Sequence, residues 1–464
     1  MKYLSFAIAV ILSESSIAQP PPSFISSNIS NVYSFKSALA CPKFSGTPEF
    51  TLQDLTLIAI CTDPGLANAI AVQNQATEDV AIAKGAYFPS LDFMSSWGKV
   101  NQTTKYDGYS ESQQTRSTSS RMQATLSWLL FDSGFRASKL RDAHENLDAA
   151  IFSRQFAVRR VAFEVSRRFF LVLSKQEGFL ASQQAERVAK RGQEITVARY
   201  EAGIGQHSEK LLFDNNLAEA TLNKVTAEGD YAITLAELSA YALRDGSRKI
   251  RLLYPDEAEL NFSDEFLVKI EKLVTDGTEF NSRVQEAQAR VRAAQARVEA
   301  LRAEDRPSIA LILSANDDRS QPTSYLGQSV RGTSAVVQMK IPLIDGFTRN
   351  HKIRSAEALV ESQQAQLKSV ERDVNTTTWV ALARLKSEIL RAQSAQTLSS
   401  TASTLLATAQ GRFAAGVGDV FEMLRAEQDA SRAAQLLINS RYEYRIALLQ
   451  LFMELNDTSE IKFP

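Results

Sequence analysis

The sequence predicts a mainly α-helical protein made of two long helical hairpins, each preceded by a pair of β-strands. Two long stretches, 132–254 and 345–456, contain no proline, and one interior proline would cost a helix roughly 3 kcal/mol. A glycine-containing turn interrupts each stretch, at 199–212 and at 412–425. Each proline-free stretch therefore predicts two helices, both over forty residues long, that meet at a tip.

The two halves of the chain repeat each other at one offset of 213 residues (412 − 199). The first tip reads RYEAGIGQHSEKLL and the second RFAAGVGDVFEMLR. The same offset relates the strand-end motifs LLFDSGFR (129–136) and PLIDGFTR (342–349). One offset that holds at sites far apart in the chain predicts a tandem duplication.

The composition limits the classes of partner. The formal net charge is −1, and 23% of the residues are charged, with both signs present. Nucleic-acid binding needs a basic excess, which this chain lacks, so no nucleic-acid partner is expected. Beyond the N-terminus no run of about 18 apolar residues occurs, so a membrane-spanning helix is not expected.

The N-terminus predicts export. Lys2 precedes an apolar run from Leu4 to Leu12, and Ser16 and Ala18 supply small residues before a cleavage point. We interpret residues 1–18 as a signal peptide, with a short buried apolar segment as the alternative. Residues 19–51 predict an N-terminal tail, rich in Pro, Ser and Asn, in the periplasm.

The two cysteines both lie near the N-terminus. Cys41 and Cys61 are close enough in an exported chain to close one loop as a disulfide. Two buried unpaired thiols are the alternative, and a metal site is not supported because no histidine lies nearby.

The expected domain order follows from the repeat. Its parts are the first repeat over 52–250, a connector over 251–275, the second repeat over 276–456 and a C-terminal tail over 457–464. The first repeat holds a helix, a β-hairpin at 90–131 and the helical hairpin 132–250; the second holds a helix, a β-hairpin at 308–344 and the helical hairpin 345–456. Residues Ile151, Val158, Val165, Val172 and Phe179 recur every seven positions, as in a coiled coil.

The predicted strands alternate apolar and polar residues, as a sheet with two different faces requires. In the first hairpin two strands of about ten residues flank a polar loop, Gln102–Ser120, and are long enough to cross a bilayer when tilted. Sheet edges in hydrocarbon leave backbone groups unpaired, so four strands per chain would have to close into a barrel of several chains, twelve strands for three. Aromatic residues near the strand ends fit interfacial girdles: Tyr87, Phe88, Trp97, Trp128 and Phe131. An ordinary soluble sheet is the alternative.

In this order and spacing, the duplication, the strand-end motifs and the paired tips resemble the TolC family of outer-membrane efflux and secretion channels. The resemblance covers about Leu52 to Asn456. The opening Cys41…Cys61-Thr-Asp-Pro is similar to the branch that serves type I toxin secretion.

The resemblance implies a homotrimer in the bacterial outer membrane. Its four strands per protomer would form a twelve-stranded β-barrel among outer-membrane lipid, continued by an α-barrel of the long hairpins in the periplasm. The implied function is the passive exit duct of a tripartite system, for type I protein secretion or small-molecule efflux. A periplasmic adaptor and an inner-membrane ABC or RND transporter would be its partners. A soluble periplasmic coiled-coil adaptor is the alternative function.

The resemblance also assigns roles to tip residues. Glu209 and Glu422 would ring the closable entrance and favour cations there, with a solvated acid at a helix start as the alternative. The family's latch positions hold Phe413, Gly418 and Arg425, so the usual latch cannot form, and we expect Glu422 to pair with Arg425 or with an adjacent chain. The expected adaptor-docking backbones are Ala202-Gly203-Ile204 and Ala415-Gly416-Val417.

No pattern in the sequence supports catalysis. His144, His207 and His351 are scattered without metal-ligand spacing. Gly203-Ile204-Gly205 follows a helix and lacks the third glycine of a dinucleotide loop. We therefore expect neither an enzyme nor a cofactor or metal site.

Overall fold

The computed structural model describes residues 49–105, 108, 112–247, 250–253, 268, 270–272, 274, 281–322 and 326–455. All of them belong to one compact unit, Phe44–Pro464. The expected signal peptide, most of the N-terminal tail, Cys41 and the C-terminal tail lie outside the described residues. Most of the expected connector 251–275 also lies outside them, whereas both tips and most of the expected strand and helix segments lie inside them.

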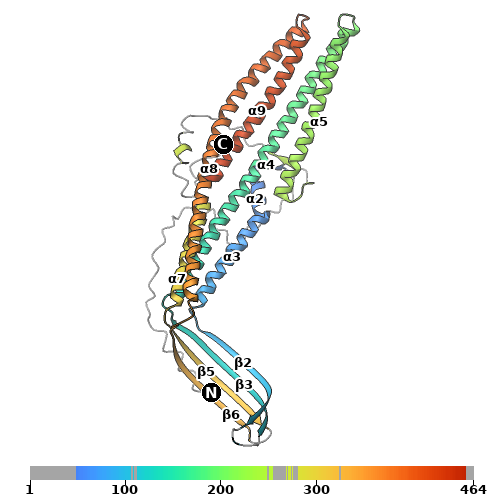
Figure 1. Ribbon diagram of the computed structural model, residues 1–464. Helices are drawn as coiled ribbons and strands as arrows, with labels where there is room; N and C mark the ends of the chain where they lie inside the picture. Colours follow the sequence, from blue (N-terminus) through green and yellow to red (C-terminus); the bar gives the residue numbers. More distant parts are fainter. Residues whose placement is uncertain are drawn as a thin grey trace. The chain divides into compact units, whose positions relative to one another are not determined.

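The elements follow the same order in both halves (Figure 1). The first half contains α2 (Leu52–Thr62), α3 (Pro64–Gly85), β2 (Ser90–Lys105), β3 (Ser112–Phe131), α4 (Phe135–Glu201) and α5 (His207–Leu243). The second half contains α7 (Ser282–Glu304), β5 (Ser308–Pro322), β6 (Gln328–Lys340), α8 (Thr348–Ala414) and α9 (Val420–Glu454). Two short strands, β1 (Glu49–Phe50) and β4 (Arg251–Leu252), pair in parallel.

The backbone repeats at the offset seen in the sequence. Helices α4 and α8 each have 67 residues, and both their first and last residues are 213 positions apart (348 − 135 and 414 − 201). Helices α5 and α9, which run back from the tips and are called the returning helices below, are shorter than expected. They contain 37 and 35 residues. The expectation of over forty residues was wrong for them; α5 ends early because Arg244 takes a left-handed conformation, with φ of 58°.

The long helices pack side by side, each against the next. Toward the tips the order is α5, α4, α9, α8, and toward the strands it is α3, α4, α7, α8. The returning helices end where the shorter helices begin: Asn281 Nδ2, at the start of α7, donates to the Glu454 carbonyl at the end of α9 over 2.8 Å. Likewise Thr62 Oγ1 donates to the Ala242 carbonyl near the end of α5 over 3.4 Å.

The buried side chains form three clusters along the helices. The largest surrounds Val165, Phe169 and Leu173 of α4 where α2 and α5 cover them. A second joins α8 to α9 around Leu385 and Leu451, and the third lies near the tips. Of the predicted heptad seam, Val165 and Val172 are fully buried and the other three members are half-buried.

The four long strands form one antiparallel sheet in the order β2-β3-β5-β6. They contain 16, 20, 15 and 13 residues, so the prediction of ten-residue strands with a polar loop over Gln102–Ser120 was wrong. The β2–β3 register runs without a break from Ser90↔Ser127 to Lys105↔Ser112. Backbone pairing does not require apolar side chains, and threonine suits strands, so the sheet continues beyond the apolar segment.

Among the described residues, no single helix is long and apolar enough to cross a membrane. One bent pair, α2 with α3, reaches the required length and composition when both helices are taken together, with a bend of 52° between them.

Candidate functional site

The two tips have the same backbone geometry. Gly203 and Gly416 both have φ of 75°, a left-handed conformation that favours glycine. In the first tip, the Ile204 and Gly205 N–H groups donate to the Arg199 carbonyl over 3.1 and 3.0 Å. Val417 and Gly418 donate to the Arg412 carbonyl at the same two distances. The duplicated sequence therefore encodes the same turn twice.

The predicted docking residues form the exposed end of each turn. Ala202, Gly203, Ala415 and Gly416 are all exposed. The apolar side chains of Ile204 and Val417 are 74% and 72% exposed. Each tip thus presents a glycine flanked by uncovered apolar groups.

The second glycine of each turn is required by close backbone contact. A Cβ at Gly418 would lie 2.6 Å from the Phe413 nitrogen, and a Cβ at Gly205 would lie 3.0 Å from the Tyr200 nitrogen. This tight turn leaves no space for a side chain at Gly418. The tight turn therefore accounts for the glycine at this position.

The predicted ion pair between Glu422 and Arg425 was wrong within this chain. Glu422 Oε1 instead lies 3.2 Å from Arg412 Nη1, across the turn in its own hairpin. Arg425 points outward, with its nearest carboxylate, that of Asp429, at 4.0 Å. Arg412 is at the end of α8 and Glu422 at the start of α9, so their pair links the two arms of the hairpin.

The first tip uses the corresponding residues differently. Arg199, the counterpart of Arg412, lies over the Phe413 ring with 5.4 Å between its guanidinium carbon and the ring centroid. Glu209, the counterpart of Glu422, is half-buried in the first turn of α5. Arg199 thus reaches from the first hairpin to the second.

Phe413 lies in the core rather than on the surface of the tips. It is 3% exposed, and its ring centroid is 5.6 Å from that of Phe213 in α5. The cluster around it also contains Ala409, Val420, Met423 and Ala426. The expected entrance residue therefore holds the two hairpins of one chain together.

Glu427 is a buried carboxyl group that the sequence analysis did not single out. Its Oε2 accepts from Asn216 Nδ2 of α5 over 2.8 Å. Burial raises its pKa, and the hydrogen bond from Asn216 opposes that rise. Its position four residues after Met423, on the apolar face of α9, was the signal that could have revealed it.

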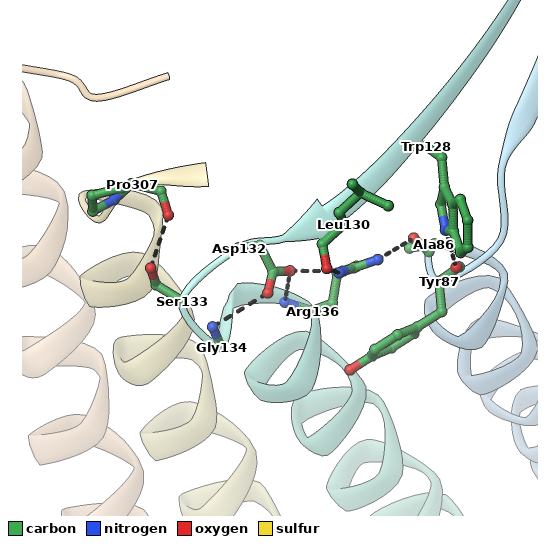
Figure 2. Close-up of polar contacts among 9 residues, drawn as sticks. All are labelled: Ala86, Tyr87, Trp128, Leu130, Asp132, Ser133, Gly134, Arg136 and Pro307. Atoms are coloured by element: carbon green, nitrogen blue, oxygen red, sulfur yellow. Dashed lines mark hydrogen bonds and ion pairs between the residues drawn. The ribbon is translucent and has the colours of Figure 1, made fainter. Parts of the chain in front are cut away.

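A second polar site lies where the strands meet the helices (Figure 2). Asp132 Oδ2 accepts from both the backbone N–H and the Nε of Arg136, each over 2.8 Å. The Arg136 guanidinium stacks on the Tyr87 ring, 4.6 Å from its centroid, and donates to the carbonyl of Ala86. The motif FDSGFR thus joins the start of α4 to the end of α3.

Two further hydrogen bonds fix the strands at this junction (Figure 2). Trp128 Nε1 donates to the Tyr87 carbonyl over 3.1 Å, and Ser133 Oγ donates to the Pro307 carbonyl over 2.8 Å. In the second repeat, Asp345 forms the corresponding pair with Arg349 at 2.9 Å. The strand-end motifs are therefore structural junctions, repeated in both halves.

The sheet has one apolar and one polar face, as the alternating pattern predicts. The apolar face carries, among others, Leu91, Phe93, Trp97, Leu126, Trp128, Leu311, Leu313, Val337 and Met339. The opposite face carries Asp92, Ser96, Gln123, Thr125, Ser314, Asn316, Asp318 and Gln338. Leu91, Phe93 and Trp97 are exposed in the single chain, so this apolar face is uncovered and is suited to contact with an apolar environment.

The two predictions that remain concern the disulfide and metal binding. Cys61 is half-buried in α2, and its proposed partner Cys41 lies outside the described residues, so the disulfide stays a prediction. Within the described part of the chain, no group of three or more His, Cys, Asp or Glu residues could hold a metal ion.

Comparison with known proteins places this architecture in a family. A family model described as outer membrane efflux protein matches residues 57–242 and 278–456. The chain belongs to the outer membrane efflux protein family. This confirms the resemblance drawn from the duplication, the strand-end motifs and the tips.

Two known proteins are similar to this chain in sequence, and a solved structure is similar to it in fold. Protein CyaE of Bordetella pertussis is 29% identical over 397 residues, which cover 84% of this chain and 81% of that protein. Outer membrane protein TolC of Vibrio cholerae is 24% identical over 416 residues, 86% of this chain and 89% of that protein. The solved Campylobacter jejuni CmeC outer membrane channel has the same fold, with a TM-score of 0.72, 14% identity and coverage of 87% and 85%.

Membership of the outer membrane efflux protein family settles the broad class of the protein. It is a channel protein of the bacterial outer membrane that extends into the periplasm. The soluble-adaptor alternative is not supported. The family and the structural neighbours are channels rather than enzymes.

Proposed function

We propose that the protein is the passive exit duct of a tripartite export system and works as a homotrimer. The observation that carries this proposal is the four-stranded sheet, which has one apolar face, one polar face and two open edges, on β2 and β6. In a bilayer, each unpaired backbone group on those edges would cost several kcal/mol. Pairing β2 of one chain with β6 of the next removes both edges when the ring closes.

A ring of three gives a barrel of twelve strands with the polar face inside. The polar face then lines a water-filled passage, and the apolar face contacts lipid. Trp97 and Trp128 lie toward opposite ends of the apolar face, eight residues apart by the strand register. At about 3.3 Å per residue and a tilt of about 40°, that distance spans roughly 20 Å of the membrane.

The tips are the proposed periplasmic entrance and adaptor-docking surface. Their exposed glycines and the apolar side chains of Ile204 and Val417 offer a closely approachable surface for an adaptor tip. Three copies of Glu422 would add negative charge at the mouth, and the pair with Arg412 would reduce it.

In such a system the transporter in the inner membrane would select the cargo and supply the energy, and the duct would be passive. Type I protein secretion and small-molecule efflux both fit such a duct. The similarity to protein CyaE across most of the chain supports the secretion branch that the opening around Cys61 resembles.

Cell fractionation and planar bilayers test the proposal. We expect heat-resistant trimers in the outer membrane and cation-preferring conductance from the purified trimer. Glu422→Ala should lower the cation preference about severalfold, whereas Glu361→Ala, on α8 away from the tip, should leave it unchanged. Recovery of the protein as a soluble periplasmic monomer without conductance would overturn the duct.

A further inference from the structure

The apolar face of the sheet ends in a pair of arginines. Cross-strand register defines its last rungs. Phe93, Ala124, Ala315 and Thr333 lie side by side, followed toward the hairpin loops by Ser95, Met122, Asp317 and Arg331. Arg319 follows in the next rung, level with Trp97. The charged groups thus lie on the apolar face, at the end farther from the helices.

Asp317 holds the two arginines beside each other. Arg319 Nε lies 3.1 Å from Asp317 Oδ1, and Arg331 Nε lies 3.1 Å from Asp317 Oδ2. The arginine side chains are 57% and 73% exposed, so both guanidinium groups keep N–H donors that face outward. Two positive charges against one carboxylate leave the group with a net charge of +1.

A hollow of about 380 Å³ adjoins this charged group. Its lining includes the small residues Ala124, Ala315 and Thr333 and the larger Phe93 and Met122, and is completed by Gln123, Asn316 and Gly332. Asp317 and Arg331 border it as well. The site therefore combines an apolar depression with adjacent guanidinium groups, as an amphipathic anion requires.

We propose that Arg319 and Arg331 bind the phosphate of a phosphorylated glycolipid of the outer leaflet, with an acyl chain of that lipid in the adjoining hollow. This inference rests on the proposed function, because it takes the apolar face to contact lipid. Charge complementarity points to a phosphate group, because the N–H donors that Asp317 leaves available on Arg319 and Arg331 can bind phosphate oxygens. Trp97 at the same level fits the membrane–water boundary.

The opposite face supplies a matched control. Arg121 pairs with Asp318 over 2.8 Å in the rung that neighbours Asp317, but on the polar face. That pair is neutral overall, with one positive and one negative side chain. A lipid headgroup bound through Arg319 and Arg331 should therefore be insensitive to Arg121.

Native mass spectrometry of the detergent-solubilised full-length trimer tests the site with bisphosphorylated lipid A as the probe. We expect Arg319→Gln combined with Arg331→Gln to weaken lipid A binding at least tenfold. Arg331→Lys should weaken it less, because the charge stays and the fork is lost. Arg121→Gln should bind lipid A like the wild type. Dephosphorylated lipid A should bind weakly to the wild type and to every variant.

Three outcomes would overturn the site: equal lipid A binding by the double variant, equal binding of phosphatidylglycerol, or retention of inorganic phosphate as strongly as lipid A. The last two would indicate a general anionic surface or a free-phosphate site. Planar-bilayer conductance of each variant separates this failure from failure of the duct. If the double variant forms conducting trimers and still binds lipid A like the wild type, only the lipid site is rejected. If the wild-type protein neither trimerises nor conducts, the lipid site and the proposed duct are both rejected.

Discussion

At the scale of single residues, Glu427 is the titratable group with the clearest consequence for stability. It lies 8% exposed between α9 and α5, and its second carboxylate oxygen has no hydrogen-bond partner among the described residues. Burial raises its pKa above the ordinary value of 4.5. Because the folded-state pKa lies above the unfolded one, Glu427 favours folding when protonated.

We predict that Glu427→Gln raises the melting temperature of the trimer above pH 7 and leaves it nearly unchanged near pH 4.5. The contribution of Glu427 is fully present below its unfolded pKa and is lost as the pH rises through the folded pKa. The amide can still accept from Asn216 and carries no charge to bury. Thermal unfolding from pH 4.5 to 8 measures the difference, and a constant difference across that range would contradict this assignment.

Glu186 provides a control of opposite sign. The hydrogen bond with Lys224, at 2.9 Å, lowers the pKa of this half-buried carboxyl group. Its contribution to stability is therefore present above the unfolded pKa and is lost as the pH falls through the folded pKa. Glu186→Gln should lower, not raise, the melting temperature near neutral pH.

At the scale of elements, the hairpins depend on close approach between their arms. Gly192 of α4 faces Phe213 of α5, and a Cβ at this glycine would lie 2.7 Å from the phenylalanine ring. Phe213 is fully buried in the tip cluster, so its ring has no room to move away. The small residue therefore sets the spacing of the first hairpin below its tip.

We predict that Gly192→Ala destabilises the protein by about 1–3 kcal/mol, because the added methyl overpacks this contact. Gly229→Ala is the matched control, since that helical glycine has nothing within 4 Å of its Cβ position. Helix propensity alone should then stabilise α5 by up to about 1 kcal/mol. Chemical denaturation of both variants measures the change in the free energy of unfolding, which should have opposite signs. Equal changes would show that contact with Phe213 does not limit the residue at position 192.

At the scale of the whole molecule, the two repeats are joined near their tips by Phe413. It contacts Phe213 of the first hairpin and lies under Arg199 of the same hairpin. We propose that these contacts take the place of the polar latch, which Phe413 and Gly418 cannot form. If the tips form the proposed entrance and it opens by separation of the two hairpins, that motion breaks these contacts.

We predict that Phe413→Ala increases the conductance of the trimer in planar bilayers and destabilises it by about 3–5 kcal/mol, because a buried aromatic contact is lost. Phe421→Ala is the control: this phenylalanine lies in the same tip but is 66% exposed. It should change stability and conductance little. Lower stability of Phe413→Ala without any change in conductance would confine Phe413 to a structural role.

The sequence was most informative where local chemistry alone determines structure. The tip turns and the long helices could be predicted because a left-handed turn and a proline-free helix depend on nearby residues. The duplication could be predicted because one offset relates matching residues throughout the chain. Strand length could not, since the polar half of β2 is held by backbone pairing with β3, which has no apolar signature. The partners of Glu422 and Phe413 were missed because they depend on which residues the fold brings together across and between the hairpins.

The end-to-end meeting of helices at Asn281 and Glu454 has a mechanical consequence. Two of the four helices at that level, α4 and α8, are continuous, whereas α5 and α9 end there against α2 and α7. A swing of α9 about its last turn stretches the hydrogen bond to Asn281 and leaves its own backbone hydrogen bonds intact. The same swing of α8 would have to bend a continuous helix. We therefore expect α5 and α9 to move more easily than α4 and α8, the two continuous helices at this level.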